Sequence, residues 1–109
     1  MNITLKVYNG KEVVKEYTAE TIDFSFGVIE DILGTIDVDN LDISDNKAIG
    51  FVVIKCMKQL KPLLKDIFVG ITDDEIRNTH IQNLVEVFKG LINYATGELT
   101  SVANETSKN

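Results

Sequence analysis

The first part of the chain has the alternating pattern of a β-hairpin. Apolar residues alternate with polar or amphipathic ones from Ile3 to Tyr8, which is the period of two expected for a half-buried strand. Asn9 and Gly10 follow, and both residue types tolerate the positive φ angles of a type I′ turn. A second β-prone run returns from Glu12 to Tyr17. We therefore predict an N-terminal hairpin of two antiparallel strands.

The apolar spacing then changes to that of a helix. Either Ser25 or Asp23 is suitably placed to cap its N-terminus. The apolar positions that recur every three or four residues are Phe26, Ile29, Ile32, Leu33 and Ile36. We predict a helix that ends near Ile36 and is weakened by two glycines.

Acidic residues dominate the stretch from Asp37 to Asp45, which invites comparison with a calcium loop. An EF-hand loop requires glycine at its sixth position and a bidentate glutamate at its twelfth. Counted from Asp37, those positions hold Asp42 and Ala48, so the pattern fails. We interpret the stretch as a solvated connection that ends in a helix cap at Ser44 or Asp45.

The longest predicted helix runs from Asn46 to Phe68, with a broad apolar face. Pro62 should bend or divide it between Lys58 and Pro62, because proline removes a helical hydrogen bond. The opposite face carries a row of four lysines, namely Lys55, Lys58, Lys61 and Lys65. That row is either a solvated face or a surface that meets an acidic partner.

A glycine turn and a helix-start signal follow. Gly70 is suited to end the preceding helix, and Thr72 with Glu75 forms a capping box. The last predicted helix runs from Ile81 to Tyr94 or Leu99. Residues 97–109 are predicted to be a polar, disordered tail behind a single domain of residues 1–96. The predicted fold class is α+β, a hairpin followed by three to four helices.

Composition and charge narrow the function classes. A chain of 109 residues with 44% hydrophobic residues suits one domain with its own core. The net charge of −6 opposes a nucleic-acid partner, which clustered basic residues would have to bind. The single cysteine, Cys56, excludes a disulfide framework and favours a reducing cytoplasm. No secretory signal and no apolar run long enough for a bilayer is recognised, so no membrane partner is expected.

Candidate chemistry is sparse. His80 is the one histidine and lies at a predicted helix start, so neither a hydrolytic triad nor a four-ligand zinc site can be assembled. The carboxylates of Asp73, Asp74 and Glu75 are explained by their place in the first turn of a helix. No phosphate-binding loop is present. We predict a non-enzymatic protein without a cofactor or metal.

Charge is distributed unevenly along the chain. Residues 1–50 hold ten acidic and four basic residues, whereas residues 51–109 hold seven of each. The lysine row of one copy could therefore meet the acidic region of a second copy, so a homo-oligomer is an open alternative.

The order of these elements resembles the tail assembly chaperones of bacteriophages with long, non-contractile tails, from phages or prophages of Gram-positive bacteria. The resemblance covers most of the chain, through the hairpin and the two segments 63–76 and 83–95. Its shared features are the hairpin, a helix, an acidic connection, a long helix, a short glycine and threonine turn with acidic residues, a final helix and a polar tail.

The resemblance implies a protein that binds and solubilises the tape measure protein while the tail tube assembles in the host cytoplasm, and that is absent from the mature virion. It also implies a longer form, made by ribosomal frameshifting, that recruits the tail tube protein; the polar end of this chain from Thr96 suits such a junction. Two alternatives remain. One is a structural phage component, either a head-tail connector or a tail terminator, and the other is a small cytoplasmic protein-binding regulator.

A chaperone for a helical client needs an apolar groove with a polar rim. We expect some of five large side chains to be partly exposed, or buried only on oligomerisation, against the alternative that all are core. These five are Phe51, Met57, Phe68, Phe88 and Tyr94.

Overall fold

The computed structural model describes residues 2–21, 24–37 and 40–107, with side chains described up to residue 97. Its first element is the predicted hairpin, in which β1 (Asn2–Asn9) pairs antiparallel with β2 (Glu12–Glu20). β2 is three residues longer than predicted. Asn9 pairs with Glu12, so the turn is centred on Gly10 and Lys11. Among the described residues only Gly10 and Gly70 have positive φ, so the type I′ prediction for Asn9 is wrong.

The two strands of the hairpin have different environments. β1 buries the alternate residues Ile3, Leu5 and Val7 in the core, whereas most of β2 is exposed. The outward backbone of β1 is also satisfied: the Lys6 N–H donates to Oδ1 of Asn83 at 2.7 Å, and Asn83 Nδ2 donates to the Thr4 carbonyl at 3.3 Å. β1 is therefore the inner strand, and β2 forms the edge of the sheet.

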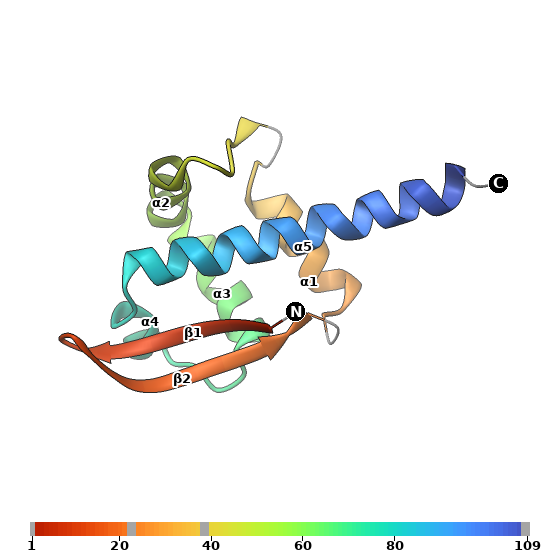
Figure 1. Cartoon of the computed structure of the whole chain (residues 1–109). Helices are drawn as coiled ribbons and strands as arrows, with labels where there is room; N and C mark the ends of the chain where they lie inside the picture. The colour runs from red at the N-terminus through yellow and green to blue at the C-terminus, as the bar shows by residue number, and fades with distance from the viewer. Residues whose placement is uncertain (1, 22–23, 38–39, 108–109) are drawn as a thin grey trace.

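Five helices follow the hairpin among the described residues (Figure 1), which exceeds the predicted three to four. The α+β class with an N-terminal hairpin is confirmed. The helices are α1 (Phe26–Thr35), α2 (Asn46–Lys55), α3 (Met57–Ile67), α4 (Asp73–Arg77) and α5 (Ile81–Ser107).

The predicted helix caps are present where they can be described. The side chain of Ser25 accepts a hydrogen bond from the Val28 N–H at the start of α1, and Asp45 caps α2. Thr72 and Glu75 form both halves of the capping box of α4. Gly70 has a φ of 93°, as a residue that ends a helix in the left-handed region requires. The alternative cap, Asp23, lies outside the described residues.

The predicted long helix is divided at Cys56, and the predicted break between Lys58 and Pro62 is wrong. Cys56 leaves the helical region with φ −101° and ψ 12°, and serves as the last cap of α2 and the first of α3. Pro62 lies inside α3. In a helix a proline ring crowds the carbonyl four residues earlier, here that of Lys58, and we therefore attribute the bend just before α3 to Pro62.

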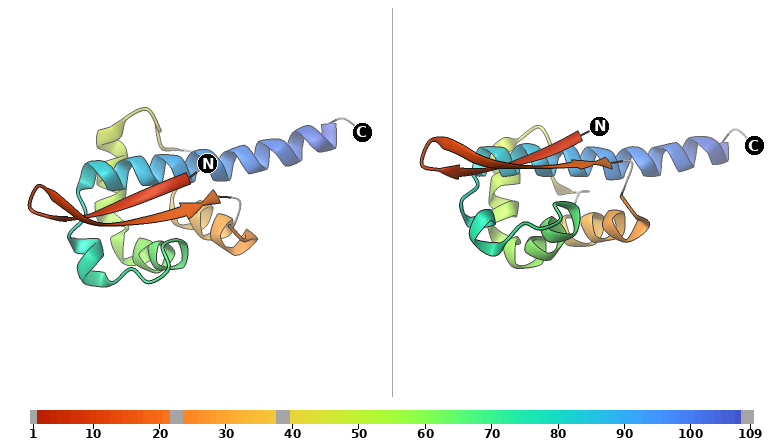
Figure 2. Two further views of the ribbon diagram at one scale, coloured as in Figure 1. Left: turned by 60° about the horizontal axis from the view of Figure 1, so that its bottom comes forward. Right: turned by 90° about the horizontal axis from the view of Figure 1, so that it is seen from below.

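α5 is the central element: β1 and α2 pack along its first half, and α1 lies near its middle (Figures 1 and 2). Phe88 and Leu91 are fully buried there. The last turns of α5 project from the rest of the molecule (Figure 2). The whole chain measures 53 × 27 × 21 Å. The helix continues to Ser107 where a disordered tail is predicted, since an anchored helix extends at little cost once it is nucleated. No described helix has the length and apolarity needed to cross a membrane.

Candidate functional site

An exposed apolar groove lies between α2 and the first turns of α5. Phe51 and Ile54 on α2 are 54% and 64% exposed, and Ile81 at the start of α5 is 43% exposed. The three side chains line one cavity of about 570 Å³. Large apolar side chains that gather at one place on a surface are typical of a protein interaction site.

The packing of α2 onto α5 explains why these side chains face outward. α2 buries Ile49 and Val53 on one side, and Gly50 brings its backbone close to Val85 of α5, where an added Cβ would lie 3.8 Å from the valine methyl. Phe51 and Ile54 are three residues apart and fall on the opposite side. Gly50 and Val85 therefore form the floor of the groove, and the exposed residues form its walls.

The rim of the groove is polar. Lys47, Glu86 and Lys89 line it, and the Lys89 ammonium donates to Oδ1 of Asn46 at 3.0 Å, which links α5 to the start of α2. α2 spans about 15 Å at 1.5 Å per residue. A groove of this length with an apolar floor and a charged rim suits about three turns of an amphipathic helix, which would insert residues spaced three and four apart.

The predicted aromatic and methionine residues occupy different environments. Phe51 lines the groove, whereas Met57 and Tyr94 are half-buried; the Tyr94 ring meets Phe24 edge-on with 5.5 Å between ring centroids. Phe68 and Phe88 are 1% and 0% exposed. These two are core residues, and their prediction as partner-binding residues is wrong for the folded chain because helix packing covers both rings.

The lysine row is not one continuous face. Lys55 ends α2, whereas Lys58, Lys61 and Lys65 belong to α3, so the bend at Cys56 separates the first from the others. Lys65 also forms an ion pair of 2.7 Å with Asp73, which lowers the pKa of that carboxyl. Three of the lysines therefore share one face of α3 at helical spacing, with Lys65 already paired, while Lys55 is separated from them.

His80 lies just before α5 and packs against the hairpin. Its ring stacks on Tyr8 with centroids 3.6 Å apart, and its Nε2 lies 3.1 Å from the Gly10 carbonyl oxygen. These contacts hold the start of α5 against the turn. In the part of the chain that the structure describes, no three His, Cys, Asp or Glu side chains lie together as a metal site would require.

Sequence reasoning missed two of the three groove residues, Ile54 and Ile81. The sequence predicted one long helix across Cys56 with a single apolar face. Ile54 lies outside that face and was not assigned to any surface. A usable signal was present, because Phe51 and Ile54 are apolar residues at helical spacing outside that face.

The chain matches no protein-family model, and neither a curated protein nor a solved structure matches it.

Proposed function

We propose that this protein is a non-enzymatic tail assembly chaperone that binds and solubilises the tape measure protein of a long-tailed bacteriophage. The observation that carries the proposal is the groove between α2 and α5. Phe51, Ile54 and Ile81 expose apolar surface there, although most of the other large apolar side chains described in α2 and α5 are buried in the core. A chaperone must present such a surface to an aggregation-prone helical client.

The client would lay its apolar stripe along the groove as a helix. Its apolar residues would contact Phe51, Ile54 and the floor at Val85, while its polar side would meet the rim charges. The rim offers Lys47 and Lys89 against Glu86, so acidic residues that flank the client stripe would be favoured.

The same proposal places the protein in the host cytoplasm during tail assembly and outside the mature virion. Recruitment of the tail tube protein would belong to a longer frameshifted form. A homo-oligomer remains compatible, since the groove of one copy could be covered by a second copy until the client displaces it.

Co-expression with a fragment of the tape measure protein from the same genome tests the proposal. The wild-type chain should keep the fragment soluble and co-purify with it, and the double variant Phe51→Ser with Ile54→Ser should do neither. Phe26→Ser is the matched control, because Phe26 is 76% exposed on α1 and does not line the groove. A fragment that stays insoluble with the wild-type chain would refute the proposal.

Particle composition separates this function from a structural role. Purified virions should lack the protein if it is an assembly chaperone. Its presence at stoichiometric amounts would instead support the head-tail connector or tail terminator.

A further inference from the structure

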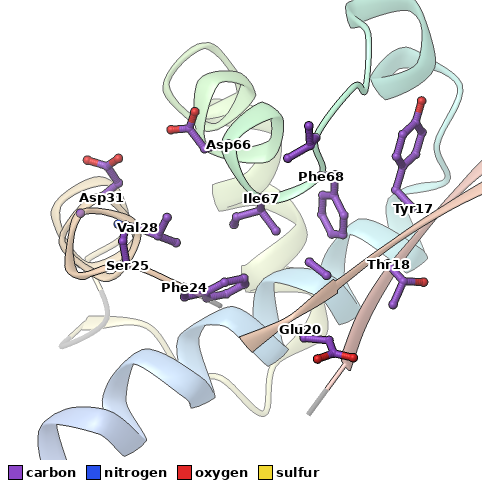
Figure 3. A pocket seen from close by; sticks show the side chains of 13 residues that line it. Tyr17, Thr18, Glu20, Phe24, Ser25, Val28, Asp31, Asp66, Ile67 and Phe68 are labelled. Carbon is purple, nitrogen blue, oxygen red and sulfur yellow. Dashed lines mark hydrogen bonds between the residues drawn. The ribbon is translucent and has the colours of Figure 1, made fainter. Parts of the chain in front are cut away.

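A second groove of about 670 Å³ runs beside β2, on a different part of the molecule from the groove between α2 and α5. Figure 3 shows it bounded by β2 on one side and by α1 and the end of α3 on the other. Its apolar surface comes from Phe24, Val28 and Ile67, and Val69 at its margin is 84% exposed.

The backbone of β2 on this side has no strand partner. The sheet has two strands among the described residues, and β2 pairs only with β1. The Lys6 N–H and the Thr4 carbonyl point away from β2 toward Asn83, so the pairs Thr4 with Thr18 and Lys6 with Glu16 do not exchange backbone hydrogen bonds. The N–H and C=O groups of Glu16, Thr18 and Glu20 therefore point outward along the open edge.

The groove is acidic as well as apolar. Among the described residues, its lining includes the carboxylates of Glu20, Asp31 and Asp66 and no lysine, arginine or histidine. Figure 3 shows Asp31 and Asp66 on neighbouring helices, across the groove from β2. An occupant that places positive charge here would be attracted from several sides.

A second copy of this chain is a poor occupant of the edge. Two β2 strands that pair antiparallel about a twofold axis at Thr18 would set Glu16 of one copy opposite Glu20 of the other. Pairing about Glu16 would set that glutamate opposite itself. Like charges directly opposite each other destabilise a strand pair, so both of these registers are unfavourable for a second copy. A twofold axis at Tyr17 would instead set Glu16 opposite Thr18, but the acidic groove beside the strand still favours a partner of opposite charge.

We propose that the edge of β2 binds an extended basic segment of a partner protein, which adds as a third antiparallel strand. Basic residues of the segment pair with Glu16 and Glu20 on the solvent face, and the apolar residues between them enter the groove over Phe24 and Val69. The fitting pattern is basic, apolar, polar, apolar, basic. This site is separate from the helical groove and does not depend on the chaperone function.

A labelled synthetic peptide, Lys-Val-Thr-Val-Lys with blocked ends, is the probe, and fluorescence polarisation measures its binding. Thr18→Pro removes one outward N–H that β1 does not use, and proline is tolerated on a strand edge. Thr18→Val keeps that N–H and is the matched control, because both variants lose the contact of 3.1 Å between the Thr4 and Thr18 hydroxyls. Circular dichroism verifies that both variants fold.

The peptide should bind Thr18→Val like the wild type and bind Thr18→Pro about tenfold more weakly, because a ladder hydrogen bond is lost. The double variant Glu16→Gln with Glu20→Gln should weaken binding by about twofold to fivefold per charge, as exposed pairs do. A peptide with glutamate in place of lysine should not bind.

Three results would overturn the proposal. The first is equal binding to Thr18→Pro and Thr18→Val, which would exclude strand addition. The second is no binding of the basic peptide to the wild type at millimolar concentration. The third is a dimer that Thr18→Pro dissociates, which would assign the edge to a second copy.

Discussion

The hydroxyl of Tyr17 donates a hydrogen bond of 2.7 Å to a carboxylate oxygen of Glu75, 58 residues further along the chain. The same carboxylate accepts from the Thr72 N–H in the capping box, and Lys15 lies 3.3 Å from its other oxygen. The Glu75 side chain thus caps the N-terminus of α4 and also links β2 to that helix. The Tyr17 hydroxyl is the main cause of the lowered pKa of Glu75, with help from the Thr72 N–H and Lys15.

This lowered pKa makes stability depend on pH. The folded state binds the Glu75 proton more weakly than the unfolded state does. The ionised carboxylate therefore stabilises the fold fully above the ordinary glutamate pKa of about 4.3. This stabilisation is lost as the pH falls through the lowered pKa of the folded state. Glu75→Gln should therefore cost more stability at pH 7 than at pH 2, as measured by urea unfolding. Equal costs at both pH values would contradict the geometry.

Tyr17→Phe tests the same contact from the other side. Loss of the donor hydroxyl should raise the pKa of Glu75 toward its ordinary value, which NMR titration of the carboxyl carbon would measure. An unchanged Glu75 pKa in the variant would show that Tyr17 is not the dominant cause.

Asn83 satisfies two backbone groups of β1 from α5. Asn83→Ala would leave the Lys6 N–H and the Thr4 carbonyl without their partner, at a cost of about 1–3 kcal/mol in the free energy of unfolding. The neighbouring Gln82 is exposed, so Gln82→Ala should change stability by less than about 0.5 kcal/mol. A similar cost for both variants would show that the Asn83 contacts are not important to the hairpin.

Phe88 is a core residue and Phe51 a surface residue, so truncating them to alanine should lower the free energy of unfolding by different amounts. Phe88→Ala should destabilise the fold by about 3–5 kcal/mol because the ring is fully buried. Phe51→Ala should stay within about 0.5 kcal/mol, since half of its ring is already in water. Chemical denaturation would distinguish them, and a large loss for Phe51→Ala would remove that residue from the exposed groove.

Pro62 lies in the interior of α3, where proline is disfavoured relative to alanine by about 3 kcal/mol. Pro62→Ala restores the N–H and removes the clash with the Lys58 carbonyl, so thermal stability should rise. Gly70→Ala should lower it, because a φ of 93° is strained for any residue with a Cβ. If Pro62→Ala is destabilising, the bend at Cys56 has another cause.

Local signals in the sequence predicted the elements that local interactions define. The hairpin needed only strand alternation and a turn glycine, and the caps at Ser25, Asp45 and Thr72 depend on residues within three positions of each other. The type I′ assignment failed because either Asn9 or Lys11 can accompany Gly10 in the turn, and pairing across the strands decides between them.

Long-range contacts could not be inferred in the same way. The hydrogen bonds of Tyr17 to Glu75 and of Asn83 to β1 form only because the hairpin packs across the helices. The outward position of Ile54 depends on which side of α2 packs against α5. For the candidate groove, the sequence therefore identified Phe51 but not the residues around it.

NMR mapping of the tape measure fragment onto the ¹⁵N-labelled chain tests the central claim most directly. We predict that amide shifts change for residues 46–54 and 81–89, which form the two sides of the groove, and that Phe51→Ser with Ile54→Ser abolishes the changes while Phe26→Ser does not. An absence of shift changes at saturating fragment, or changes confined to elements outside these two segments, would contradict the claim.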